Sequence, residues 1–227
     1  MPAYEAVRTI AKVVADVRRA MPDVCAAEGA LVVVDDGSHD GTGAMAAREG
    51  ATVITHRTNR GKGAALATGL AYADAHGFDT ALTVDADGQH PADSARALLL
   101  AATDARALVL GVRDLVRDGA PRANQLSNRI SNFFLSRFTG VVLADTQCGL
   151  RRYPVKETLA LGARAAGYAF EAEVILRAVA AGVPIVEVPV EVVYPNEDER
   201  VSHFDVVRDP ARIVGVVVRT LVELRRG

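Results

Sequence analysis

The sequence predicts an α/β fold in which helices flank a mostly parallel sheet. Short runs of β-branched residues alternate with stretches of helical periodicity, which is typical of parallel sheets. The apolar runs lack the alternation of half-exposed strands, as expected for strands that are covered on both faces. Loops rich in Asp and Gly follow two of these runs, where open α/β sheets bind their ligands.

The predicted elements follow one another along the first half of the chain. A helix is expected over 5–21, because apolar residues recur there at helical spacing. Further helices are expected to end at Gly50 and Gly77, since glycine often ends a helix, and another is expected over 92–102. The predicted strands of this half are 30–34, 51–56, 80–84 and 107–113.

The second half of the chain is less regular. It contains a predicted amphipathic helix over 124–139, and a polar loop that enters a short strand over 145–153. A helix over 168–182 and a strand over 184–194 follow. The 227 residues contain no repeat and no linker, so a single domain with one sizeable core is expected.

Composition and charge exclude several classes of protein. The net charge of −2 and the lack of a basic stripe argue against nucleic acid as a partner. Cys25 and Cys148 lie far apart without CxxC spacing, which argues against a disulfide framework or a zinc site. No apolar run approaches the roughly 18 residues that span a bilayer, and no secretory signal opens the chain, so a cytoplasmic location is expected.

The stretch VDADGQH (84–90) places two carboxylates one residue apart at the end of a predicted strand. Mg²⁺ and Mn²⁺ prefer a few oxygen ligands from the protein, supplemented by phosphate oxygens of a substrate. Asp85 and Asp87 therefore form a candidate metal site, because a bound cation would relieve the repulsion between them. Such a cation would neutralise the charge of a departing diphosphate. The alternative is an acidic turn that binds nothing.

Three further motifs carry candidate binding residues, each with a plainer alternative. VVDDGSHDGT ends a strand near Asp36, which can accept hydrogen bonds from a base or ribose, or can belong to a capped turn. NRGKG places Lys62 among glycines before a helix, which suits a phosphate or a solvated basic loop. DTQCGLR offers Asp145 as a base and Arg151 as an anion contact, or a polar loop with a salt bridge.

Together these motifs resemble those of the family 2 glycosyltransferases. The resemblance rests on PAYE, VVDDGSHDGT, NRGKGAAL, VDADGQHP, DTQCGLR and YAFEAEVILRAVAAG…IVEVPV in that order, and it covers nearly the whole chain. The most similar branch contains dolichyl-phosphate mannose synthase and bacterial polyprenyl-phosphate sugar transferases. The resemblance implies a Rossmann-like GT-A fold, with a nucleotide-sugar half near 1–113 and an acceptor half near 114–227.

The same resemblance implies the reaction and its cofactor. The donor would be a nucleotide-diphosphate sugar of the GDP-mannose or UDP-glucose type, and transfer would invert the anomeric carbon. The acceptor would be a polyprenyl phosphate or another lipid-linked group, and the cofactor Mg²⁺ or Mn²⁺. A lipid phosphate is already ionised, whereas a hydroxyl acceptor would make Asp145 the candidate general base. Asp87 and Asp145 are therefore the candidate catalytic residues.

The resemblance also implies roles for individual residues. Those expected to bind the nucleotide sugar are Pro2, Tyr4, Glu5, Val34, Asp36, Lys62, Asp85, Ala86, Asp87, Gln89 and Arg113. Those expected to hold the metal are Asp85, Asp87 and Gln89, with Asp87 foremost. Those expected at the acceptor are Arg129, Arg151, Arg200 and His203, the last standing where the mannose synthases have a lysine.

Two features of the sequence leave alternatives open. Apolar residues lie beside arginines around 133–138 and 213–224. This pattern indicates either a surface that lies on an anionic bilayer or residues that belong to the hydrophobic core. In the first case the protein would attach peripherally to the inner face of the cell membrane. In the family an apolar strand precedes PAYE, and Met1 stands at its last position here. The chain as written is therefore expected to lack its first strand and to be less stable or less active than a longer version. The alternative is a genuine variant whose sheet closes differently.

Two rival functions also remain on the sequence alone. A nucleotidyltransferase also combines an α/β sheet with acidic metal ligands, although its usual glycine-rich loop with a basic residue at the first strand is absent. The second rival function is that of a degenerate domain that binds a nucleotide sugar but has no catalytic activity.

Overall fold

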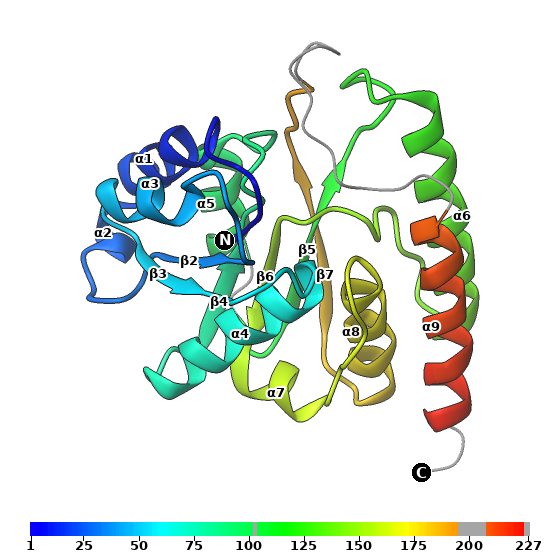
Figure 1. Cartoon of the computed structure of the whole chain (residues 1–227). Coiled ribbons are helices and arrows are strands. Elements are labelled where there is room, and N and C mark those ends of the chain that lie inside the picture. Colours follow the sequence, from blue (N-terminus) through cyan, green and yellow to red (C-terminus); the bar gives the residue numbers. More distant parts are fainter. Residues whose placement is uncertain (102–103, 195–207, 225–227) are drawn as a thin grey trace.

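The computed structural model of the protein describes residues 1–101, 104–194 and 208–224. These ranges form two sheets with helices packed around them (Figure 1). The smaller sheet has the strand order β1-β2-β3 and is parallel throughout. Its strands are β1 (Pro2–Ala3), β2 (Val32–Asp35) and β3 (Thr52–Thr55). The helices of this part are α1 (Ile10–Ala20), α2 (Pro22–Cys25) and α3 (Thr42–Arg48).

The larger sheet has the strand order β4-β6-β5-β7 and mixes parallel and antiparallel pairs. Its strands are β4 (Thr80–Thr83), β5 (Leu108–Arg113), β6 (Arg151–Pro154) and β7 (Ile185–Val190). Strands β5 and β7 are parallel, whereas β6 is antiparallel to both of its neighbours. The remaining helices are α4 (Lys62–Ala75), α5 (Ala92–Leu100), α6 (Arg122–Thr139), α7 (Val155–Ala160), α8 (Ala169–Ala180) and α9 (Arg208–Leu224).

The alternation of strands and helices confirms the predicted α/β class of the GT-A type. The sequence did not predict that the short strand after the DTQCGLR loop would run antiparallel in the middle of the larger sheet. All four residues of β6 are buried, although its sequence RRYP begins with two arginines. A hydrophobic pattern could not identify a central strand with two charged residues, because burial depends on the partners of Arg151 and Arg152.

The first strand is present as a short element. Strand β1 pairs in parallel with β2, with Pro2 opposite Val34. The amino group of Met1 donates a hydrogen bond to the Val32 carbonyl (2.7 Å), and the Val34 amide donates one to the Met1 carbonyl (2.8 Å). In the described part of the chain, no strand pairing joins β1 to the larger sheet. A strand of two residues therefore stands where the sequence predicted that a complete strand is missing.

Helix α1 begins at Ile10, later than the predicted start at residue 5. Glu5 has a φ of 49°, which lies outside the right-handed helical region, and side chains of the 38–42 loop bind the amides of this segment. The amide of Ala6 donates to the Thr42 hydroxyl (2.8 Å), and the amide of Val7 donates to Asp40 (3.0 Å). The DDGSHDGT loop therefore shapes the segment that follows β1.

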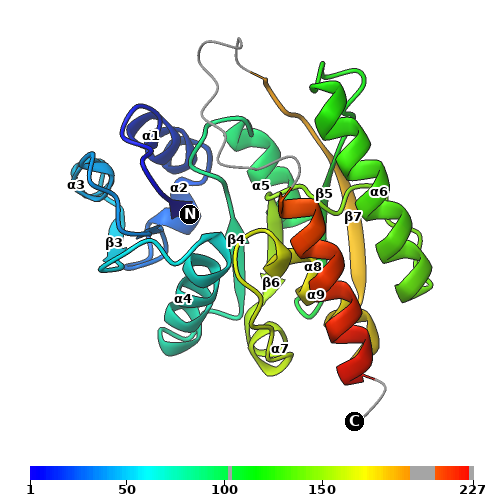
Figure 2. The same ribbon diagram turned by 45° about the vertical axis from the view of Figure 1, so that its right-hand side comes forward.

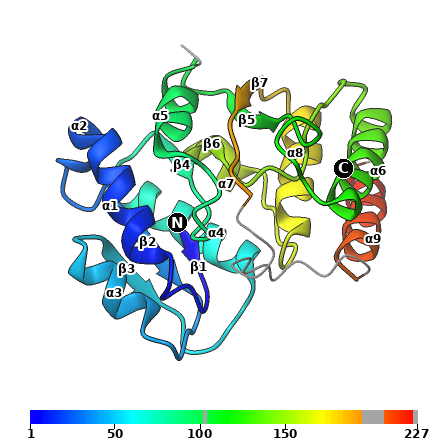
Figure 3. The same ribbon diagram turned by 90° about the horizontal axis from the view of Figure 1, so that it is seen from above.

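The main core lies around α8, which is buried along most of its length. Helix α9 packs against both α8 and α6. Figures 1, 2 and 3 agree that α6 and α9 lie side by side at the end of the molecule opposite α1 and α3. None of the helices in the described ranges combines the length and the apolar character that crossing a membrane requires.

Candidate active site

Several of the predicted site residues lie at the carboxyl ends of β2, β4 and β5. The loop after β4 contains Asp85, Ala86 and Asp87, and it is tied to the segment after β1 by a hydrogen bond from the Thr9 hydroxyl to the Ala86 carbonyl (2.6 Å). This is the edge at which open α/β sheets bind ligands. The structure thus brings the acidic motif and the PAYE segment together.

The two carboxylates of the acidic motif differ in their surroundings. Asp85 accepts contacts from the Lys62 ammonium at 2.9 Å and 3.1 Å through its two oxygens. Burial opposes ionisation of Asp85, but Lys62 outweighs it, so the pKa of Asp85 is lowered. Burial and the negative charge of Asp85 raise the pKa of Asp87 to about 6. One oxygen of Asp87 accepts a hydrogen bond from the Gln89 amide (3.0 Å).

Lys62 is held between carboxylates from two different elements. It is the first residue of α4, and its ammonium also lies 3.4 Å from Glu171 on α8 and 5.4 Å from the centre of the Tyr168 ring. Burial alone would lower the pKa of Lys62, but the two carboxylates raise it above its ordinary value. Lys62 is therefore a charged, largely buried cation beside Asp85.

A glycine provides the space for this ion pair. A Cβ atom added to Gly149 would collide with Asp85 and would lie 2.8 Å from the Lys62 ammonium. Any other residue at this position would push the acidic motif and the lysine apart. Gly149 belongs to the DTQCGLR motif, so that motif supports the acidic one.

A metal ion fits the chemistry of this site, provided that a substrate supplies further ligands. No group of three or more His, Cys, Asp or Glu side chains that could hold a metal occurs among the described residues. Asp85 and Asp87 offer two neighbouring carboxylates, and a quarter of the Asp85 side chain is exposed. Mg²⁺ is commonly bound in this way, by one or two carboxylates plus phosphate oxygens.

Asp36 does not present a free carboxylate to a ligand. Its oxygens accept hydrogen bonds from the amides of Arg60 (3.0 Å) and Gly61 (2.7 Å), and one contacts the His56 ring at 2.6 Å. The other ring nitrogen of His56 contacts the Thr68 hydroxyl at 2.9 Å. Asp36 therefore fixes the backbone of the NRGKG loop directly before Lys62 in the sequence. Its predicted contact with base or ribose would have to compete with these bonds.

The other residues predicted around the nucleoside lie at the ends of β1 and β2. Tyr4 and Glu5 directly follow β1, and Glu5 has a φ of 49° and accepts a hydrogen bond from the His39 amide (2.8 Å). Pro2 pairs with Val34 across the strands. The Val34 side chain is buried and faces Gly69 of α4, which points it into the core and away from a ligand.

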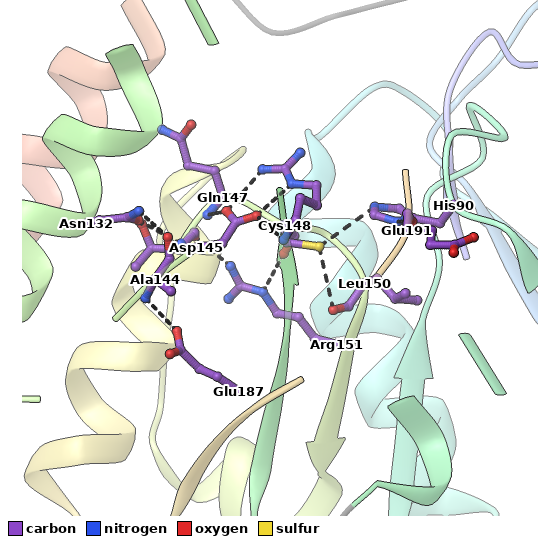
Figure 4. A network of polar contacts seen from close by, with 12 residues as sticks. His90, Asn132, Ala144, Asp145, Gln147, Cys148, Leu150, Arg151, Glu187 and Glu191 are labelled. Atoms are coloured by element: carbon purple, nitrogen blue, oxygen red, sulfur yellow. Dashed lines mark hydrogen bonds and ion pairs between the residues drawn. The ribbon is translucent and has the colours of Figure 1, made fainter. Parts of the chain in front are cut away.

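Arg113 and Asp145 form a second charged pair, at the end of β5. Asp145 accepts hydrogen bonds from Arg113 through Nε (2.7 Å), Nη2 (3.1 Å) and the backbone amide (3.2 Å). It also accepts one from the Gln147 amide (3.1 Å), and its side chain is fully buried (Figure 4). Both oxygens of Asp145 are thus occupied, so its role as a general base stays a prediction that would require the pair with Arg113 to open.

Arg151 is also bound inside the fold. Its side chain is fully buried, and its nitrogens donate hydrogen bonds to the carbonyls of Cys148 (2.8 Å), Thr146 (2.7 Å) and Glu171 (3.0 Å). Each of the three guanidinium nitrogens donates a hydrogen bond inside the fold, so the contact of Arg151 with the acceptor stays a prediction that would require these bonds to break. Arg129 lies exposed on α6, and Arg200 and His203 lie outside the described residues.

An apolar groove runs between α6 and α9. It is lined by Ile130, Phe134, Phe138, Val214 and Val218, with Ser127 and Gln147 as polar members. The Gln147 side chain donates a hydrogen bond to the Ser127 hydroxyl (3.0 Å), and the Gln147 amide binds Asp145. The groove is therefore connected to the Arg113–Asp145 pair through Gln147.

Sequence reasoning missed Glu171, Gly149 and Gln147. An acidic residue inside the apolar run YAFEAEVIL was a usable signal for Glu171, because a charge buried in a helix needs a partner. Gly149 and Gln147 stand within a motif that the sequence analysis identified. Their roles depend on the approach of β6 to β4 and of α6 to the 144–147 loop, which no local pattern predicts.

Comparisons with known proteins agree with this geometry. The family model of glycosyl transferase family 2 matches residues 1–159. The chain is 33% identical over 204 residues to a polyprenol monophosphomannose synthase of Mycolicibacterium smegmatis, covering 84% of this chain and 74% of the relative. It is 29% identical over 201 residues to an undecaprenyl-phosphate mannosyltransferase of Micrococcus luteus, covering 84% and 80%.

The fold also matches solved structures. A glucosyl-3-phosphoglycerate synthase of Mycobacterium tuberculosis, in complex with Mn²⁺, UDP and glucosyl-3-phosphoglycerate, superimposes with a TM-score of 0.73 at 19% identity. The match covers 97% of this chain and 78% of that one. At this identity the match supports the fold alone.

Proposed function

The chain belongs to glycosyl transferase family 2, and from this premise we propose that it transfers a hexose from a nucleotide-diphosphate sugar to a polyprenyl phosphate, with inversion at the anomeric carbon. Relatives named as polyprenol monophosphomannose synthase and undecaprenyl-phosphate mannosyltransferase support this substrate class. In this proposal residues 1–113 bind the nucleotide sugar, and residues 114–227 bind the acceptor.

The observation that carries the proposal is the position of two charged pairs at the ends of β4 and β5. Asp85 and Lys62 form one pair, and Arg113 and Asp145 form the other. When bound to Asp85 and Asp87, Mg²⁺ or Mn²⁺ would neutralise the charge that develops on the departing diphosphate. Lys62 and Arg113 add fixed positive charges where negative charge develops, and such preorganised groups lower the barrier. Gln89 contributes by orienting Asp87 through its amide.

The pairing of Asp145 with Arg113 favours a phosphate acceptor over a hydroxyl acceptor. A hydroxyl nucleophile needs a general base within hydrogen-bond reach. The carboxylate predicted for that role is instead buried and serves to orient Arg113. A phosphate oxygen is already ionised, so it can attack the anomeric carbon without giving up a proton.

The apolar groove between α6 and α9 supports the lipid part of the acceptor. Isoprenoid chains are apolar, and the groove offers Ile130, Phe134 and Phe138 as a lining. Arg129 is exposed on α6, where it can meet an anionic headgroup or the acceptor phosphate. A cytoplasmic protein attached peripherally to the membrane through this face would reach both of its substrates. Arg200 and His203 remain proposed acceptor contacts.

The test is a transfer assay with matched acceptors. Purified protein is incubated with radiolabelled GDP-mannose or UDP-glucose, MgCl₂ or MnCl₂, and either a polyprenyl phosphate or the same polyprenol without its phosphate. Labelled lipid is expected only with the phosphorylated acceptor, and it should disappear with EDTA and in Asp87→Asn. Transfer to both acceptors would contradict the phosphate assignment. Release of labelled mannose 1-phosphate or glucose 1-phosphate, which transfer of GMP or UMP from the donor would produce, would instead support a nucleotidyltransferase, and no turnover with any donor would support a binding domain.

A further inference from the structure

Lys62 lies between two carboxylates, and only one of them belongs to the proposed metal site. Its ammonium contacts both oxygens of Asp85, at 2.9 Å and 3.1 Å, and lies 3.4 Å from Glu171. Lys62 thus occupies Asp85 in the way that a bound cation would. A divalent cation that binds Asp85 must compete with this internal cation.

Glu171 has the properties of a residue that can receive the lysine. Glu171 lies on α8 with only 3% of its surface exposed, and its Oε1 atom is buried without a hydrogen-bond partner. The Arg151 Nε lies 3.8 Å from Oε1, but the guanidinium nitrogens already donate to backbone carbonyls, and Lys62 lies 3.4 Å from the other oxygen, Oε2. A buried carboxylate is costly unless a cation is paired with it, so the Glu171 carboxylate gains from a closer approach of Lys62 to Oε2.

The site allows such a shift without moving the backbone. Lys62 has a flexible side chain and the two carboxylates already flank its ammonium, so a small displacement exchanges one partner for the other. Asp85 and Lys62 pack directly against Gly149, where a Cβ would collide with Asp85, so the glycine lets the two side chains meet at this point.

We propose that Glu171 is a positioning residue, which takes Lys62 from Asp85 when a divalent cation and the donor diphosphate arrive. In the absence of the metal, Lys62 neutralises Asp85 and keeps the acidic motif in place. With the metal, Lys62 bonds to Glu171 and its charge stays beside the diphosphate. This inference rests on the proposed function, because it assumes that Asp85 takes part in binding a divalent cation.

The test measures Mn²⁺ binding, which does not depend on turnover. Free Mn²⁺ is followed by electron paramagnetic resonance in wild type, Lys62→Met, Glu171→Gln and the double variant, with and without GDP or UDP. Lys12→Met serves as the matched control, because Lys12 also pairs with an aspartate but is exposed. Without nucleotide, Lys62→Met should bind Mn²⁺ about tenfold more tightly than wild type, and Glu171→Gln about tenfold more weakly, as typical coupling free energies allow. The double variant should behave like Lys62→Met, because Glu171 acts through Lys62.

Several results would overturn the inference. Lys62→Met that binds Mn²⁺ no more tightly than Lys12→Met would show that the lysine does not compete with the metal. An effect of Glu171→Gln that persists in the Lys62→Met background would show that Glu171 acts on its own. If Lys62→Met or Glu171→Gln does not fold, a crystal structure of the wild type with Mg²⁺ and GDP or UDP shows which carboxylate Lys62 contacts when the metal is bound. Lys62 bound to Glu171 supports the inference, and Lys62 still on both oxygens of Asp85 overturns it.

The two proposals fail in different ways. Metal-dependent sugar transfer together with unchanged Mn²⁺ affinity in Lys62→Met would reject the lysine exchange and leave the proposed function intact. The expected Mn²⁺ affinities together with no transfer to any lipid phosphate would support the exchange and reject the proposed function.

Discussion

Arg113 binds Asp145 through two guanidinium nitrogens and its own backbone amide, so the arginine at the end of β5 has a fixed direction. Asp145 reaches this position from the loop before β6, and Gln147 of the same loop binds both Asp145 and Ser127 of α6. The pair therefore links the strand ends, where the diphosphate is proposed to bind, to the groove between α6 and α9.

Asp145→Asn should lower sugar transfer without removing a general base. The side-chain amide of the substituted residue has only one oxygen, so it cannot accept the hydrogen bonds that Arg113 makes to both carboxylate oxygens, and the guanidinium loses its orientation. The transfer activity should fall about 10- to 100-fold, as is typical when such a supporting residue is removed. Arg106→Gln is a suitable control, because this arginine is exposed. The measurement is the pH dependence of kcat/KM. The acid limb should keep its midpoint in Asp145→Asn, whereas a shifted or abolished limb would mean that Asp145 is the base after all.

Arg151→Met should destabilise the fold. The substitution leaves three buried carbonyls without their donor and removes one of the two cations near Glu171, which should cost about 3 kcal/mol of unfolding free energy. The exposed Arg129 provides the comparison, and Arg129→Met should change stability by less than about 0.5 kcal/mol. Urea unfolding of both variants checks this. Equal stability of Arg151→Met and wild type would refute the structural role of Arg151.

The two cysteines should differ in reactivity. Cys148 is buried, and burial raises the pKa of its thiol to about 12, so hardly any thiolate is present at pH 8. Cys25 is only half-buried, although burial also raises the pKa of its thiol. Iodoacetamide at pH 8, followed by peptide mass spectrometry, should label Cys25 alone in the native protein and both residues in urea. Raising the pH from 7 to 9 increases the thiolate fraction of both residues, but that of Cys148 stays very small below its raised pKa, so Cys25 should remain the labelled residue at pH 9. Native labelling of Cys148 at the rate of Cys25 would contradict its burial.

The exposed part of α6 should mediate attachment to lipid surfaces. Phe133 is 65% exposed on this helix, so Phe133→Asp should not disturb the core but should weaken binding to anionic vesicles by about tenfold, the typical value of burying one aromatic side chain. Val116 is 77% exposed and lies outside the helix, so Val116→Asp is the matched control. Vesicle sedimentation gives the answer. If both variants bind vesicles as wild type does, this face of α6 does not contact the membrane.

Much of the fold could be predicted from the sequence, because its strands are continuous apolar runs. The runs around Val33, Leu82 and Val109 all form strands within a residue or two of the predicted bounds. The start of α1 could not be predicted, since it depends on side chains of the 38–42 loop that lie about thirty residues away in the sequence. The central position of β6 in the larger sheet could not be predicted either. The strand begins with two arginines, and their burial depends on tertiary partners.

The candidate site could be predicted as a set of motifs but not as a set of contacts. The sequence identified Asp85, Lys62 and Asp145 as notable residues, and the structure places two of them in one ion pair. It could not distinguish a charge that faces a ligand from one that is satisfied inside the fold. Asp145 and Arg151 both belong to the second kind, because Asp145 is bound by Arg113 and the Gln147 amide, and Arg151 by carbonyls of the 146–148 loop and α8.

The central claim is that Asp85, Asp87 and Lys62 form the binding site of a metal-bound nucleoside diphosphate. Calorimetric titration of the full chain with GDP and UDP, with and without Mn²⁺, tests this claim most directly when Asp87→Ala is titrated in parallel. One of the two nucleotides should bind in a Mn²⁺-dependent manner, and Asp87→Ala should lose this binding while it keeps the melting temperature of the wild type. Binding that is indifferent to Mn²⁺ and to the substitution, or no binding of either nucleotide to the folded chain, would contradict the claim.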